Sequence, residues 1–151
     1  MIKHREDSLA ALRTDRLTPK DAKLAEISAA CEAAIFAGVD VETSQGTEHF
    51  ALTLNDQTNI GNLALQAAQG SPVLYHADGE ICRIFTPEEF GAVATAAVTH
   101  KTYHTTLCNH INVWVRRTTD EAKLAKITYT AKLPKDLADN MNALLGGDGD
   151  E

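Results

Sequence analysis

The longest regular pattern of apolar and polar positions runs from Thr86 to Arg117. Thr86 fits the N-cap, Pro87 fits the first helical position, and Glu89 completes a capping box three residues after the cap. No proline interrupts the stretch before Arg116 and Arg117, whose charges suit a helix C-terminus. The pattern therefore predicts one helix over about 87–117, which is roughly 45 Å long at 1.5 Å per residue.

Both sides of this helix are predicted to contact protein. The core face comprises Phe90, Val93, Ala94, Ala97, His104, Cys108, Ile111 and Val115. The opposite face carries Thr95, Thr99, Thr102, Thr106 and Val113, and Lys101 is the only charge between Glu89 and Arg116. Threonine is a mediocre helix former, so a threonine stripe suits an exposed helix poorly. We expect a homo-oligomer through the Thr95/Thr99/Thr102/Thr106 face, with a solvated threonine-rich surface as the alternative.

Before Thr86, segments with helical periodicity alternate with segments of strand periodicity. Thr18-Pro19 begins a helix that ends at Gly38, with Leu24, Ile27, Cys31, Ala34 and Ile35 at helical spacing. Alternation from Val39 to Leu54, with a turn at 44–47, predicts a hairpin, and Asn55 or Asp56 caps a second helix ending at Gly70. A second hairpin over 73–85 has Asp78-Gly79 as a type I′ turn. That turn pairs Val73 with Ile84 and Tyr75 with Cys82.

The fold class is therefore predicted as α+β. Because isolated hairpins are marginal, the two should join in one four-stranded antiparallel sheet, in the order αββ-αββ-α. Beyond Arg117, a helical turn, an alternating strand over 127–133 and a helix opened by Pro134 are expected. The predicted domains are an N-terminal arm or short helix over 1–17, a single α+β domain over 18–145, and a flexible acidic tail over 146–151.

Composition narrows the range of partners. The chain has 151 residues, a net charge of −7 and no basic cluster larger than a pair, which argues against nucleic acid. No apolar run is long enough for a membrane span or a signal peptide, so a soluble protein made in the cytosol is expected, with no membrane partner. Three cysteines, Cys31, Cys82 and Cys108, are each predicted on an apolar face as small buried hydrophobes.

Three groups of residues are candidates for chemistry, and none is strong enough to assign. His100, His104 and Cys108 share one helix face, but Cα atoms eight residues apart lie about 12 Å from each other, so no metal site is assigned. The His104/Cys108 pair lacks a third catalytic group, and no cofactor or catalytic motif occurs, so we expect no enzyme. The polar run Asn55–Asn59 beside His76 is a possible small-ligand surface, with plain helix capping as the more ordinary explanation.

Four strings carry a family resemblance: LTLNDQTNIGNL, YHADGEICRIFTPEEF, HTTLCNHINVWV and ITYTAKLP. With them the chain resembles, from about Lys23 to Leu145, a domain of unknown function found in tailed-bacteriophage and prophage proteins of tail, baseplate and tail-fibre regions. The matching positions are Asp56, Gln57, Asn59, Ile60, His76, Asp78, Gly79, Thr106, Asn109, Tyr129, Leu133 and Pro134.

The resemblance implies a setting and no catalytic or binding residues. The expected function is a non-enzymatic phage structural or accessory protein. It would be a tail- or baseplate-associated component or assembly factor that contacts itself and other tail proteins, in the virion or the host cytoplasm. Two alternatives are an accessory protein that binds a small ligand, such as a host signalling nucleotide, between subunits, and a metal-dependent enzyme.

Overall fold

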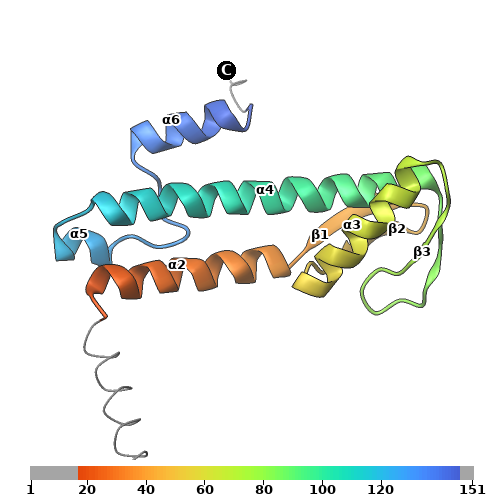
Figure 1. The fold of residues 1–151 in the computed structure, drawn as a ribbon, viewed down its shortest axis with the longest axis horizontal. Helices are drawn as coiled ribbons and strands as arrows, with labels where there is room; N and C mark the ends of the chain where they lie inside the picture. Colours follow the sequence, from red (N-terminus) through yellow and green to blue (C-terminus); the bar gives the residue numbers. More distant parts are fainter. Residues whose placement is uncertain (1–16, 147–151) are drawn as a thin grey trace, which may run out of the picture. The chain divides into compact units, whose positions relative to one another are not determined.

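A computed structural model describes residues 17–146 (Figure 1). The chain forms two compact units. The mixed unit comprises residues 31–106, and the helical unit comprises residues 17–30 and 107–146 within the described range. Two helices contribute residues to both units: α2 (Pro19–Phe36) and α4 (Pro87–Arg117). The expectations for residues 1–17 and 146–151 lie outside the described residues, apart from Leu17 and Gly146.

The predicted long helix is confirmed. Helix α4 runs unbroken over 31 residues, and the Glu89 amide donates to Thr86 Oγ1 at 3.1 Å, as predicted for the N-cap. The Glu89 carboxylate bonds the Ser44 amide and Arg83, so the second half of the predicted capping box is replaced by these contacts. Helix α2 begins after Thr18, whose hydroxyl accepts from the Asp21 amide at 3.0 Å, and Gly38 follows it with φ +85°. A Cβ on Gly38 would lie 2.1 Å from the Phe50 carbonyl oxygen, so both the conformation and the space at this position require glycine.

The mixed unit combines two strand pairs with helix α3. Its elements are β1 (Val39–Thr43), β2 (Gly46–Phe50), α3 (Leu54–Ala68), β3 (Val73–Tyr75), β4 (Arg83–Phe85) and the first part of α4. Aromatic rings form the centre of its core. The ring centroid of Phe85 lies 6.1 Å from that of Phe50 and 5.9 Å from that of Phe90, and the ring centroids of Tyr75 and Phe90 lie 5.7 Å apart. These rings are buried with Leu52, Ile60, Val73 and Val93, so the core holds α3, α4 and both strand pairs together.

The helical unit has its own apolar core. Ile27 of α2 is buried with Ile111 and Val115 of α4, and Leu124 and Ile127 complete the cluster. Leu124 lies on α5 (Glu121–Ala125), whose N-cap Asp120 accepts from the Ala122 and Lys123 amides. Helix α6 (Lys135–Leu144) adds a hydrogen bond of 2.8 Å between His110 Nε2 and Asn140 Oδ1.

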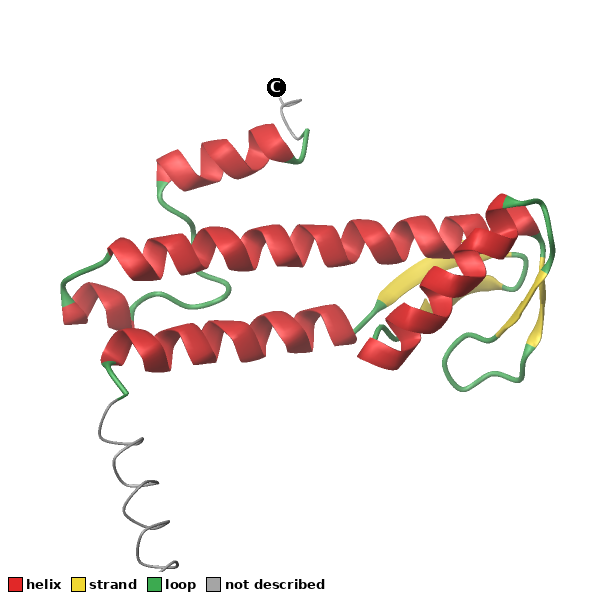
Figure 2. Cartoon of the chain, in the orientation of Figure 1, coloured by secondary structure: helices red, strands yellow, loops and turns green. Residues whose placement is uncertain are grey.

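The predicted four-stranded sheet is wrong. Within residues 17–146 the strands form two separate antiparallel pairs, β1–β2 and β3–β4, and 61% of the structure is helical (Figure 2). The predicted strand over 127–133 is also absent from the described residues, where a turn closes with the Ala131 amide donating to the Thr128 carbonyl. Ile127 is buried and Tyr129 and Leu133 pack beside it, so their alternation reflects packing on helices rather than a ladder of strands.

The register predicted for the second hairpin is off by one residue. Val73 pairs with Phe85, Leu74 with Ile84 and Tyr75 with Arg83, and seven residues, 76–82, separate the strands. Gly79 has φ +75°, but Asp78 does not have positive φ, so the type I′ turn is excluded. A slip of one residue exchanges the two faces of a strand. Both faces of this hairpin are partly apolar and are predicted to be covered, but only the face with Phe85 is buried, while Ile84 and Cys82 are exposed.

In the part of the chain that the structure describes, none of the helices combines the length and apolar character needed to cross a membrane.

Candidate functional site

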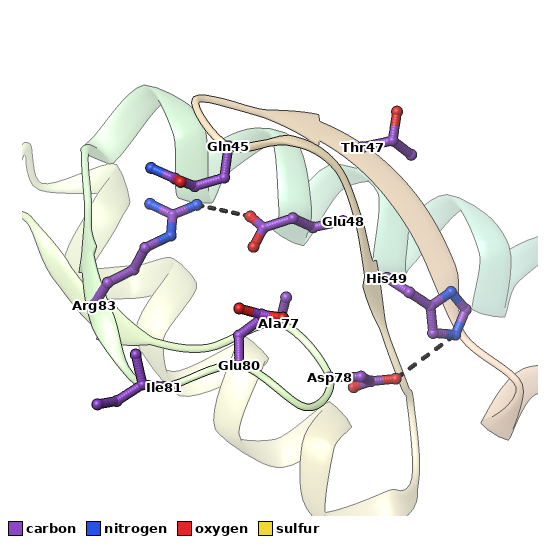
Figure 3. Close-up of a pocket in the computed structure, with 9 residues that line it drawn as sticks. All are labelled: Gln45, Thr47, Glu48, His49, Ala77, Asp78, Glu80, Ile81 and Arg83. Carbon is purple, nitrogen blue, oxygen red and sulfur yellow. Dashed lines mark hydrogen bonds and ion pairs between the residues drawn. The ribbon is translucent and has the colours of Figure 1, made fainter.

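A polar cleft of about 510 Å³ lies in the mixed unit between the β1–β2 hairpin and the loop 76–82 (Figure 3). Hydrogen bonds set the position of that loop. The Asp78 amide donates to the His49 carbonyl at 2.9 Å, and Asp78 Oδ1 accepts from the Ala51 amide at 3.0 Å. The lining residues are Gln45, Thr47, Glu48 and His49 from the hairpin, and Ala77, Asp78, Glu80, Ile81 and Arg83 from the loop and β4.

Arg83 forms the charged centre at one end of the cleft. Its guanidinium lies 2.8 Å from Glu48 Oε1 and 3.1 Å from Glu89 Oε1, and its Cζ lies 3.8 Å from the centroid of the Phe85 ring. The side chains of Glu48 and Glu89 are 11% and 10% exposed, so the two ion pairs are largely shielded from water. The cation therefore ties β2, β4 and the start of α4 together.

The two carboxylates are stabilised as anions. The hydrogen bond from Arg83 lowers the pKa of Glu89 to about 2, and the Ser44 amide, which donates to Glu89 Oε2 at 2.7 Å, adds to this effect. The Thr43 hydroxyl, 2.6 Å from Glu48 Oε1, is the main reason that the pKa of Glu48 is lowered, followed by Arg83. Both groups stay charged at neutral pH, and Arg83 is neutralised by them.

His49 lies at the other end of the cleft and contacts three oxygen atoms. Its Nδ1 is 2.6 Å from Asp40 Oδ1, its Nε2 is 2.6 Å from the Ala37 carbonyl oxygen, and Asp78 Oδ2 is 3.7 Å from Nε2. The hydrogen bond to Asp40 is the main cause of a raised His49 pKa, with Ala37 and Asp78 acting in the same direction and desolvation opposing them. These contacts favour a protonated ring.

Carboxylates predominate among the charged groups that line the cleft. The cleft offers three carboxylates, Glu48, Asp78 and Glu80, against the neutralised Arg83 and the hydrogen-bonded His49. Thr47 carries the only hydroxyl among the lining residues, and that hydroxyl donates to the Glu42 carboxylate. Such a surface fits amide, hydroxyl or cationic groups, which exchange hydrogen bonds with carboxylates.

The His100, His104 and Cys108 group is not assembled as a metal site. His100 Nε2 lies 2.9 Å from the Ala34 carbonyl oxygen, and the His100 and His104 ring centroids lie 4.6 Å apart. Desolvation, followed by the neighbouring His100, lowers the pKa of His104. Cys108 accepts from Asn112 Nδ2 at 3.7 Å. Across residues 17–146, no group of three His, Cys, Asp or Glu side chains is arranged to hold a metal ion.

The polar run Asn55–Asn59 begins helix α3. Its N-cap is Thr53, not Asn55 or Asp56 as predicted, and Asp56 closes a capping box by accepting from the Thr53 amide at 3.1 Å. Gln57 Nε2 donates to the Leu52 carbonyl at 2.9 Å, while its buried Oε1 has no hydrogen-bond partner. His76 is exposed in the loop, where its Nδ1 lies 2.9 Å from the Ala77 carbonyl oxygen. Capping accounts for Thr53 and Asp56.

Sequence reasoning missed His49, Arg83 and their partners. The observed two-residue loop 44–45 pairs Asp40 with His49 and places an acid directly opposite a histidine, whereas the predicted turn at 44–47 gives a different register. The contacts of Arg83 with Glu48 and Glu89 could not be predicted from the sequence, because they depend on how the two strand pairs pack.

The architecture defines a small mixed protein of helices and short strand pairs with a polar cleft. A family model described as a domain of unknown function, DUF4376, matches residues 18–132, and the chain belongs to this family. No curated protein and no solved structure matches the chain.

Proposed function

We propose that the chain is a non-enzymatic, oligomeric protein-binding module that serves as a structural or accessory protein of tailed bacteriophages. The tail or baseplate, or its assembly, is the proposed place of action. The exposed threonine face of α4 carries this proposal. Thr95, Thr99 and Thr102 are exposed on it, and the neighbouring Tyr103 side chain is 45% exposed. The phage setting is supported by the sequence resemblance alone.

Burial of this face would have a low desolvation cost. The Thr106 hydroxyl donates to the Thr102 carbonyl at 2.7 Å, so this polar group keeps a hydrogen bond when water is removed. Val98, beside Thr102 on the helix wheel, is 65% exposed and offers apolar surface. Lys101 is the one formal charge on α4 within the mixed unit after Glu89, so little charge opposes association there.

The face favours a second copy of the chain over an acidic partner or nucleic acid. The mixed unit carries nine carboxylates and two cations, Arg83 and Lys101, and Arg83 is already paired. A neutral strip on an otherwise acidic unit is the surface where two like units can approach with the least repulsion.

Light scattering coupled to size-exclusion chromatography tests the oligomer. We expect the wild-type chain to elute as a multimer at micromolar concentration and Thr99→Glu to shift it toward the monomer. Asn62→Glu, an exposed position on α3, adds the same charge elsewhere in the mixed unit and should leave the multimer intact. A monomeric wild-type chain would refute the proposed interface. Mass spectrometry of purified particles from a phage that encodes the chain tests the setting.

If the protein binds a small ligand, the polar cleft is a better candidate site than Asn55–Asn59. The carboxylates lining the cleft repel the phosphates of a nucleotide, and the neighbouring guanidinium of Arg83 is neutralised by Glu48 and Glu89. A thermal-shift panel of signalling nucleotides should accordingly produce no stabilisation.

A further inference from the structure

The His49 ring is held between two hydrogen-bond acceptors that belong to different elements. Asp40 lies on β1, and Ala37 directly follows α2. A neutral imidazole carries one N–H and one lone pair, so it can donate to only one of them. The Ala37 carbonyl cannot donate, and an ionised Asp40 cannot donate either. Both 2.6 Å contacts are satisfied together only when the ring is an imidazolium.

We propose that His49 is a proton-operated latch that fastens the loop 76–82 over the polar cleft and releases it when the ring loses its proton. The charged groups that face the ring are Asp40 from β1 and Asp78 from the loop, with the Ala37 carbonyl dipole beside them. Both charges are negative. A neutral ring that still donates from Nδ1 to Asp40 would turn the Nε2 lone pair toward the Ala37 carbonyl oxygen and the Asp78 carboxylate, which is a repulsive arrangement.

Asp78 links the protonation state of the His49 ring to the shape of the cleft. Its carboxylate faces the His49 ring, with Oδ2 3.7 Å from Nε2 (Figure 3). It is attached to β2 by its amide, which bonds the His49 carbonyl, and its carboxylate bonds the Ala51 amide. It also starts the tight turn in which the Glu80 amide donates to the Ala77 carbonyl at 3.1 Å. Ala77, Asp78, Glu80 and Ile81 all line the cleft, so movement of this turn changes its width.

The direction of the pH response follows from the contacts. In the folded protein Asp40 and Asp78 stabilise the protonated His49 ring. His49 therefore binds its proton more tightly in the folded protein than in the unfolded chain. The latch is therefore closed at low pH, and it opens as the pH rises through the midpoint of His49, which lies above the ordinary pKa of 6.5.

NMR spectroscopy of the full chain tests both halves of the latch. The His49 ring signals give its midpoint, and hydrogen exchange of the Asp78 amide reports the loop after correction for intrinsic exchange. We expect protection of that amide to fall about tenfold as the pH rises through the His49 midpoint. Asp40→Asn keeps the shape of the side chain and removes one facing charge, so it should move both the midpoint and the loss of protection to lower pH.

His49→Gln should leave the Asp78 amide weakly protected at every pH, whereas His76→Gln, in the same loop, should retain the wild-type response. Two results would overturn the latch: a wild-type His49 midpoint at or below that of an unstructured histidine, or Asp78 protection that does not change across the midpoint. Because Asp40→Asn is read by the displacement of a titration midpoint, it remains informative even if His49→Gln lowers stability. None of these outcomes depends on oligomerisation, so the latch and the proposed function can fail separately.

Discussion

Replacement of Arg83 by methionine should destabilise the mixed unit in a pH-dependent manner. Methionine keeps an unbranched stem for contact with Phe85 but removes the cation that lies between Glu48 and Glu89. The pKa of Glu89 is lowered from 4.5 to about 2, and each tenfold change in proton affinity corresponds to about 1.4 kcal/mol. The whole shift corresponds to on the order of 3 kcal/mol at pH 7 for a side chain that is only 10% exposed, and this is the upper limit for Arg83→Met because Ser44 also lowers the pKa.

The sign of the pH dependence follows from the lowered pKa. Stabilisation by the Glu89 carboxylate is complete above the unfolded pKa of 4.5 and is lost as the pH falls toward about 2. The cost of Arg83→Met should therefore decrease from at most about 3 kcal/mol at pH 7 to about 1 kcal/mol at pH 3. Urea denaturation followed by circular dichroism at the two pH values measures both costs.

A matched control is available in the helical unit. Arg117 pairs with Asp136 at 2.7 Å, but both side chains are well exposed, so Arg117→Met should leave the urea midpoint almost unchanged. The reasoning is refuted if Arg83→Met costs the same at pH 7 and pH 3, or if it costs no more than its exposed counterpart at pH 7.

Three further substitutions test the backbone, the register and the helix cap. Gly38→Ala should lower the free energy of unfolding by more than about 3 kcal/mol, and Gly70→Ala by about 1 kcal/mol. Both residues have φ +85°, but an added Cβ would meet other backbone atoms only at Gly38. In urea unfolding, Ile84→Thr should change stability by less than about 0.5 kcal/mol, whereas Val73→Thr should cost about 2 kcal/mol; equal costs would contradict the β3–β4 register. Thr53→Ala should cost about 1 kcal/mol and speed amide exchange in the first turn of α3, and an unchanged exchange rate would exclude the cap.

The elements with strong local signals could be predicted from sequence. Helix α4 and helix α2 have their predicted limits because capping residues, first-turn prolines and Gly38 act within a few residues of each boundary. The first hairpin also forms, but its second strand is Gly46–Phe50 rather than a strand that reaches Leu54, which instead begins α3. In each case the deciding interactions are local in the sequence.

The second strand pair could not be predicted because a longer loop replaced the expected turn. Asp78-Gly79 does form a turn, but it lies inside a seven-residue loop whose Asp78 bonds to β2. That contact comes from a different hairpin, and sequence alone does not indicate it. Since the register changed by one residue, the predicted burial of Ile84 and Cys82 was wrong as well.

The candidate site depends on packing even more strongly. Arg83, Glu48 and Glu89 are brought together by three separate elements, and no spacing rule relates them. The Asp40 and His49 pair was missed as well, because the predicted turn at 44–47 places Asp40 opposite Ala51, whereas the observed two-residue loop places it opposite His49.

The uneven distribution of charge would make the proposed assembly sensitive to ionic strength. Residues 31–106 contain nine carboxylates and only two cations, so their net charge equals the chain's net charge of −7. Copies that meet through α4 bring these acidic units within a few tens of ångströms, while the Debye length is about 30 Å at 0.01 M salt and about 8 Å at 0.15 M. Dilute buffer should therefore dissociate the multimer and added sodium chloride should restore it, the opposite of a complex held by attraction between unlike charges.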